Sequence, residues 1–113
     1  MIYDLEERAG KFGENIIYFC SKIYKNDITR PLVSQLVRSA TSVGANYMEA
    51  NQGASKKDFK NKIKISQKEA NETKHWLRMI AAADENLKNE CRVLWQEAHE
   101  LTLIFAKISK NCD

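Results

Sequence analysis

Arg38-Ser-Ala-Thr-Ser-Val-Gly-Ala-Asn-Tyr-Met-Glu-Ala50 is the stretch that most constrains the fold, because it has the pattern of a helix but carries small and polar residues on one face. The polar residues recur at steps of four, four and three, and therefore form one stripe: Arg38, Ser42, Asn46 and Glu49. Inside a helical domain such a stripe is either a buried network of mutually satisfied groups or a binding surface. Gly44 lies in the same run, where the missing side chain lets a second helix approach closely.

Two carboxylates further along the chain are suitable partners for this stripe. Glu69 and Glu72 are three residues apart and share one helix face. A turn near Gly53 would place Arg38 and Glu69 at the same level of two antiparallel helices. We therefore expect Arg38 to pair with Glu69 or Glu72, the alternative being three separate exposed charges. The expected polar network consists of Arg38, Ser42, Asn46, Glu49, Glu69 and Glu72.

Outward from this stretch, apolar residues recur at steps of three and four in four segments, which is the pattern of amphipathic helices. The first segment spans about residues 3–25, and the second runs from Thr29 to near Gly53. The third begins at Ser55 and fades at residues 84–86, and the fourth follows it. Expected core positions of the third and fourth segments are Phe59, Ile63, Ser66, Ala70, Thr73, Leu77 and Ile80, then Cys91, Leu94, Ala98, Leu101, Phe105 and Ile108.

Two helix starts carry recognisable capping signals. Thr29 is an expected N-cap with Pro31 just inside the helix, where the missing N–H of proline costs nothing. Ser55 and Asp58 form a capping-box-like pair. No strand-like alternation interrupts the helical pattern, so we predict an all-α fold, an up-down-up-down antiparallel four-helix bundle forming one domain over residues 1–113.

Composition favours a soluble protein without a redox or zinc site. The chain is 43% hydrophobic and 29% charged, and no apolar run approaches the ~20 residues of a membrane span. The N-terminus lacks a signal-peptide layout, so we expect a cytoplasmic protein with no membrane partner. Cys20, Cys91 and Cys112 include no CxxC pair, and the first two fall at core spacing, where cysteine acts as a small hydrophobe.

The basic excess is concentrated in one segment. Net charge is +3, and residues 56–78 carry eight basic and three acidic side chains. A segment of this kind attracts phosphate backbones, although a solvated helix face has the same composition. The candidate nucleic-acid-binding residues are Lys56, Lys57, Lys60, Lys62, Lys64 and Lys68.

The chain also has more apolar residues than the helix seams use. Off-seam positions include Ile17, Tyr18, Ile65 and the two tryptophans, Trp76 and Trp95. Contiguous exposed apolar surface on a small protein usually marks an interface. We expect a homo-oligomer with Trp76 and Trp95 as interface anchors, the alternative being that both complete the monomer core.

Catalytic and metal-binding patterns are weak. Glu72 and His75 form one ExxH motif, but the second such motif of a carboxylate-bridged metal site is missing. The sequence has no GxSxG elbow, HExxH helix or phosphate loop. We expect no enzyme activity, no catalytic residues, no metal and no cofactor.

Three motifs occur in order along the chain: the stretch 38–50, Ser55-Lys-Lys-Asp-Phe59, and Lys68-Glu-Ala-Asn-Glu-Thr-Lys-His-Trp-Leu77. They resemble the four-helix-bundle family encoded in intervening sequences of bacterial large-subunit ribosomal RNA genes, and are similar to the accessory variability determinant of diversity-generating retroelements. The resemblance implies an up-down-up-down bundle that assembles into a ring, with a pentamer as the expected form. In the retroelement relatives a basic surface serves nucleic acid and a reverse-transcriptase partner.

The sequence thus predicts a non-enzymatic, ring-forming helical protein that binds RNA or another nucleic acid through a basic face of the third helix. The alternative is a protein–protein adaptor or assembly scaffold without nucleic-acid binding. A metal-bound bundle is the remaining alternative.

Overall fold

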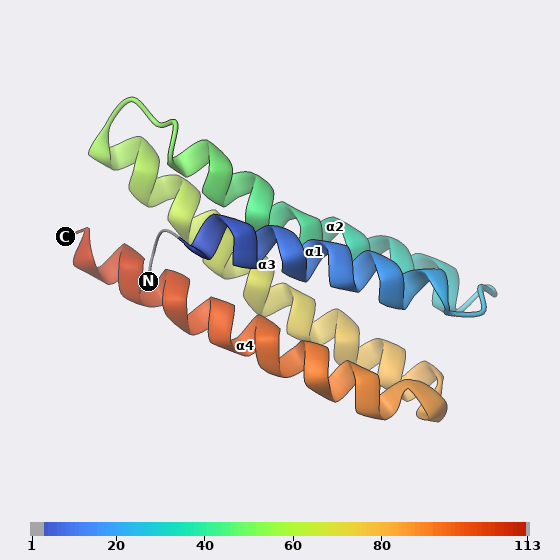
Figure 1. Ribbon diagram of the computed structural model, residues 1–113. Coiled ribbons are helices and arrows are strands. Elements are labelled where there is room, and N and C mark those ends of the chain that lie inside the picture. The colour runs from blue at the N-terminus through green and yellow to red at the C-terminus, as the bar shows by residue number, and fades with distance from the viewer. Residues whose placement is uncertain (1–3, 113) are drawn as a thin grey trace.

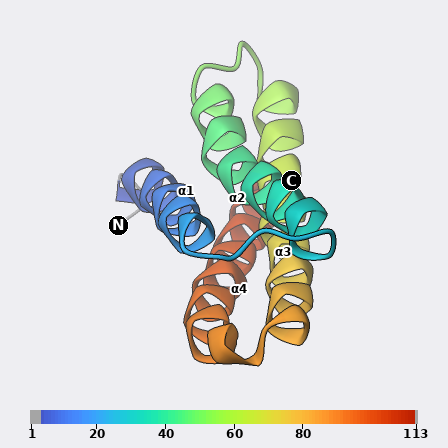
Figure 2. The same ribbon diagram turned by 90° about the vertical axis from the view of Figure 1, so that its right-hand side faces the viewer.

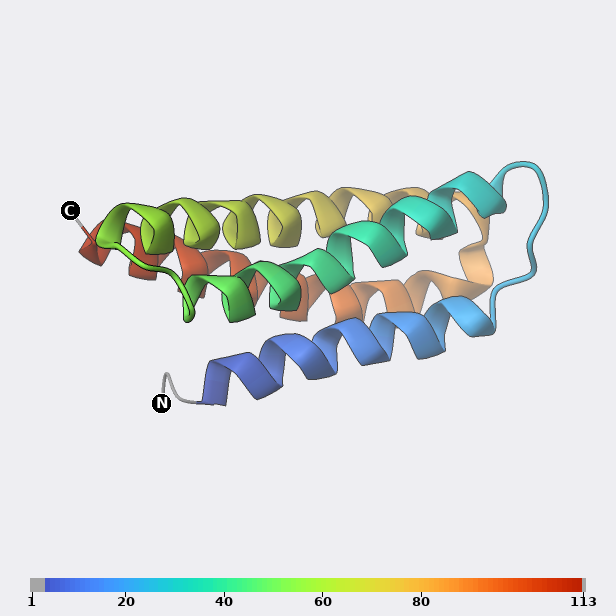
Figure 3. The same ribbon diagram turned by 90° about the horizontal axis from the view of Figure 1, so that it is seen from above.

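The computed structural model describes residues 4–112 and confirms the predicted bundle (Figure 1). Its elements are α1 (Leu5–Ser21), α2 (Thr29–Ala50), α3 (Lys56–Ala83), the 3-10 helix η2 (Glu85–Leu87) and α4 (Lys88–Asn111). Helix α1 begins and α4 ends at the same end of the molecule, beside the turn between α2 and α3 (Figure 3). The expected start of the first helix at Tyr3 lies outside the described residues.

One apolar core runs between the helices. Every predicted core position of α3 is buried except Phe59, which is half-buried. The buried positions include the hydroxyl-bearing Ser66 and Thr73. Along α4, Cys91, Ala98, Leu101 and Phe105 are buried, whereas Leu94 and Ile108 are half-buried against the core. Tyr47 of α2 meets Phe105 edge to face, with ring centroids 5.5 Å apart. The helical period alone therefore predicted which side of each helix faces inward.

Buried hydroxyl groups join α2 to α3. The Ser66 hydroxyl donates to the backbone carbonyl of Val43 at 3.0 Å, and the Thr73 hydroxyl lies 2.9 Å from that of Ser39. Ser39, Ser66 and Thr73 are all fully buried. Because each of these groups has a hydrogen-bond partner, the polar atoms do not incur the cost of unsatisfied burial.

Helices α1 and α2 lie close together at two glycines. A Cβ atom built on Gly44 would lie 3.5 Å from the backbone carbonyl of Ala9, and one on Gly13 would lie 3.6 Å from the Cα atom of Thr41. Helix α1 packs mainly on α2 and touches α4 only sparsely, and no Cα atom of α1 lies within 8 Å of one in α3. Figure 2 shows α1 to one side, apart from α3. The hairpin of α3 and α4 therefore has an outer side that α1 does not cover.

The first helix ends at Ser21, four residues earlier than the predicted end at Lys25. The backbone N–H groups of Lys22 and Ile23 bond to the carbonyls three residues earlier, which tightens and closes the last turn. The Lys25 ammonium then hydrogen-bonds the carbonyl of Cys20. Lys25 therefore caps the helix from the loop instead of extending it.

The predicted N-cap role of Thr29 is wrong. The side-chain oxygen of Asn26 accepts from the backbone N–H groups of Ile28 and Thr29, each at 2.9 Å. The Thr29 hydroxyl is instead used by the loop, where it donates to the carbonyl of Tyr24 at 2.8 Å. At the other end, α2 stops at Ala50, and a Cβ atom on Gly53 would lie only 3.1 Å from the Ala50 carbonyl oxygen, which explains the glycine.

The predicted cap of α3 is confirmed, since the Ser55 hydroxyl oxygen accepts from the backbone N–H of Asp58 at 3.1 Å. At the next turn, the carboxylate of Asp84 accepts from the N–H of Asn86 at 3.0 Å and begins η2.

Within residues 4–112, no helix combines the length and hydropathy that crossing a membrane requires.

Two buried cysteines should make the protein less stable as the pH rises in the alkaline range. Burial raises the pKa of Cys20 and of Cys91 from the ordinary thiol value of 9.0 to about 11 in the folded protein. Between these values the unfolded chain loses protons that the folded chain keeps. We therefore expect the free energy of unfolding, measured by urea denaturation, to be intact below pH 9.0 and to fall as pH rises towards about 11.

The variant Cys20→Ala/Cys91→Ala is the control for this prediction, because it removes both thiols and leaves every other ionisable side chain in place. Its stability should fall less steeply over the same pH interval. Equal slopes for the two proteins would contradict the assignment to these cysteines.

Candidate nucleic-acid interface

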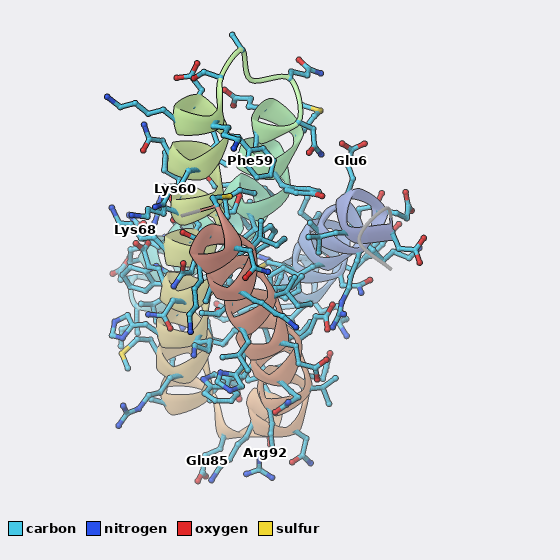
Figure 4. The ribbon with its side chains drawn as sticks, turned by 90° about the vertical axis from the view of Figure 1, so that its left-hand side faces the viewer. Glu6, Phe59, Lys60, Lys68, Glu85 and Arg92 are labelled. Atoms are coloured by element: carbon cyan, nitrogen blue, oxygen red, sulfur yellow. The ribbon has the colours of Figure 1, made fainter. Side chains whose placement is uncertain are left out.

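Five of the six candidate lysines lie on the outer side of α3. At 100° per residue, Lys56, Lys57, Lys60, Lys64 and Lys68 fall within an arc of about 120°. Lys60 is half-buried and the other four are exposed. Figure 4 shows Lys60 and Lys68 on the same side of the helix. We call this set of five residues the α3 lysine face.

Lys62 does not belong to the α3 lysine face, which corrects the grouping predicted from the sequence. It lies on the side of α3 that faces α2, and its ammonium contacts the Glu49 carboxylate at 3.1 Å. The physical reason is the helical period, since a step of two residues turns a side chain by about 200°. The charge of Lys62 is therefore paired with that of Glu49 within the α2–α3 hairpin.

An open depression borders the α3 lysine face on the side of α4. It has a volume of about 560 Å³ and is lined by Lys64, Gln67, Lys68 and Asn71 of α3 together with Thr102 of α4. Ammonium, amide and hydroxyl groups are the donors that phosphate and sugar oxygens accept from in nucleic-acid complexes. Within residues 4–112, no carboxylate forms an ion pair with Lys64 or Lys68.

Arg38 joins the two helices as the sequence suggested. Its guanidinium lies 3.1 Å from both carboxylate oxygens of Glu69 and also bonds the carboxylate of Glu72. Gln35 accepts from its Nε at 2.9 Å, and the indole N–H of Trp76 donates to Glu72 at 2.9 Å. The side chain of Glu69 is only 15% exposed, so this cluster is partly shielded from water.

The other expected members of the polar network do not join it. The hydroxyl of Ser42 donates to the carbonyl of Arg38, and the amide of Asn46 donates to the carbonyl of Ser42, both one turn back in α2. Glu49 pairs with Lys62 instead. Short polar side chains in a helix reach their own backbone more readily than a neighbouring helix, and this explains the difference.

The two tryptophans have different surroundings. Trp76 is half-buried against the core, held by its bond to Glu72 and by an edge contact with His75. Trp95 is 37% exposed; its indole stacks on His99, with centroids 5.1 Å apart, and the Lys74 ammonium lies over the ring. Their assignment as oligomer anchors stays a prediction.

Several charged groups that sequence reasoning did not single out also bridge helices. Arg8 of α1 binds Glu97 of α4 through two bonds of 2.8 Å and Glu100 through one of 2.9 Å. Hydrogen bonds from Gln96 and from Arg8 lower the pKa of Glu100. The only signal in the sequence was opposite charge on neighbouring helix faces, which does not identify partners almost ninety residues apart.

A second depression lies between α3 and the start of α4. It is lined by Leu77, Arg78, Ala81, Lys88, Cys91, Arg92 and Trp95. Sequence reasoning counted Arg78 among the basic residues of its segment but did not connect it with the two cations of α4. The four-residue spacing of Lys88 and Arg92 was the available signal.

The ExxH motif considered for metal binding has its carboxylate in other contacts. Glu72 of the ExxH motif is held by Arg38 and Trp76. In the part of the chain that the structure describes, no cluster of three or more histidine, cysteine, aspartate or glutamate side chains could hold a metal ion.

These observations define a class, an all-α four-helix bundle with a lysine-rich outer face on its third helix. The family of 23S rRNA-intervening sequence proteins matches residues 4–104, and the chain belongs to this family. It is similar to the crystal structure of a protein of unknown function from the S23 ribosomal protein family of Bacteroides thetaiotaomicron, with 28% sequence identity and a TM-score of 0.80. That match covers 93% of this chain and 94% of the other. Among curated proteins, none matches.

Proposed function

We propose that this protein binds RNA through the α3 lysine face, in a binding role that involves no catalysis. The observation that carries the proposal is the placement of five lysines on one side of α3, next to a polar depression. A row of ammonium groups attracts a phosphate backbone, and release of the counterions of that backbone supplies a large share of the binding free energy. The family relation to ribosomal RNA intervening sequences makes RNA the first nucleic acid to test.

Salt titration of the full chain with a labelled RNA hairpin tests this proposal. If the five lysines contact phosphates, the logarithm of the association constant should fall against that of salt with a slope of about −4. The affinity should then decrease on the order of a hundredfold between about 50 and 200 mM salt. Absence of binding at low salt would rule the proposal out.

A second candidate function is an assembly scaffold, in which copies of the chain form a ring. It is favoured by exposed apolar side chains along α1 and α4, where Tyr18 and Val93 border one depression of about 250 Å³. The ring form is what the resemblance implies, with a pentamer expected. Light scattering tests it directly, since a monomer at micromolar concentration would contradict it.

A further inference from the structure

We propose that the depression between α3 and the start of α4 binds one base of a single-stranded RNA segment, with Trp95 as the surface on which the base stacks. This inference rests on the proposed RNA-binding function and extends it to a second contact. It also assigns Trp95 a role other than the oligomer contact predicted from its off-seam position in the sequence.

The shape and lining of the depression suit a base with its phosphate. Leu77 and Cys91 are buried and form an apolar floor, beside the half-buried Ala81. The volume of about 260 Å³ is just below the range of ligand pockets, which run from about 300 to 1,000 Å³. A single planar base is therefore a better match than a larger ligand.

The rim of the depression is cationic. Arg78 comes from α3, and Lys88 and Arg92 come from the first turns of α4. All three are exposed, and the described residues include no carboxylate that forms an ion pair with them. The nearby Asp84 is occupied in capping η2. Three such cations around an apolar floor complement an anion attached to a flat apolar group.

Trp95 has a part of its indole available at this site. The ring stacks on His99 and lies under Lys74, and these two side chains are themselves 3.1 Å apart. Neither His99 nor Lys74 lines the depression, whereas Trp95 does. A part of the indole other than the one that meets them therefore borders the depression, where an unstacked base could lie against it.

The depression lies along the same side of the hairpin as the α3 lysine face. Arg78 is five helical turns beyond Lys60, on the same side of α3, and about 15 Å beyond Lys68 by helical rise. Figure 4 shows Lys60 and Lys68 in the upper part of α3 and Arg92 at the opposite end of the hairpin. A strand held by the lysines can thus continue along α3 and α4 and place a base at Trp95.

The experiment compares two short probes of equal length, an oligouridylate and an oligoribonucleotide whose sugars carry no bases. The full chain should bind the oligouridylate about tenfold more tightly, because stacking of one base contributes about that factor. Trp95→Ala should abolish this preference and leave the affinity for the abasic probe unchanged, whereas Trp95→Phe should retain part of it. Trp76→Phe is the matched control and should keep the full preference.

The outcomes separate the two proposals. Failure of both probes to bind the native chain would overturn the RNA-binding function and this inference together. Binding of both probes with equal affinity, or an unchanged preference in Trp95→Ala, would overturn this inference alone. A change of oligomeric state in Trp95→Ala by light scattering, with the preference retained, would assign Trp95 to a protein contact instead. Thermal melting shows whether each variant is folded.

Discussion

Arg38→Met should lower the free energy of unfolding by about 2 kcal/mol, measured from urea denaturation curves. The substitution keeps a long apolar stem but leaves Glu69 and Glu72 as neighbouring carboxylates without their shared cation. Removing one partner of a fully buried ion pair costs about 3–5 kcal/mol, and partial solvent access reduces that figure here. The side chains of Arg38, Glu69 and Glu72 are 44%, 15% and 31% exposed.

Two comparisons make this prediction specific. Adding Glu69→Gln and Glu72→Gln to Arg38→Met should recover much of the loss, because the uncompensated charges are gone and the new amide oxygen at position 72 can still accept the N–H of Trp76. Arg30→Met is the matched control in the same helix, since Arg30 is 65% exposed and lies 3.7 Å from the fully exposed Asp27. It should change stability by less than about 0.5 kcal/mol. An unchanged Arg38→Met protein would show that the cluster contributes nothing to stability.

Reversing the charge of three lysines of the α3 lysine face should produce the largest effect on RNA binding. In the variant Lys57→Glu/Lys64→Glu/Lys68→Glu, affinity for the RNA hairpin should fall by about a hundredfold or more at low salt. The dependence on salt should weaken as well, with the slope reduced by about three. These residues lie within an arc of about 40° on α3, so they would contact one stretch of backbone.

Lys62 provides the matched control for this result. Lys64→Glu and Lys62→Glu make the same change of charge two residues apart, but on different sides of α3. At physiological salt, where screening acts over about 8 Å, Lys64→Glu should weaken RNA binding several-fold, whereas Lys62→Glu should change it by less than about twofold. Equal losses would mean that total charge, and not the α3 lysine face, determines binding.

The sequence by itself determined the four helices and their buried sides. The three-and-four spacing of apolar residues encodes both, because a helix buries the stripe that its period brings together. Ser55 could be identified as a cap because its hydroxyl acts on a backbone group three residues away. Even the exclusion of Lys62 from the α3 lysine face follows from local geometry, although counting basic residues alone concealed it.

Only the tertiary structure decided which distant side chains meet. The level at which α3 and α4 pack brings Arg78 to Lys88 and Arg92, and the packing of α1 brings Arg8 to Glu97. The tertiary structure also shows that Ser42 and Asn46 do not join the Arg38 cluster. The carboxylates of that cluster were predicted correctly. The physical reason is that periodicity fixes the direction of a side chain around its own helix. Its partner on another helix depends on the tilt and axial shift between the two, which close-packed side chains set together.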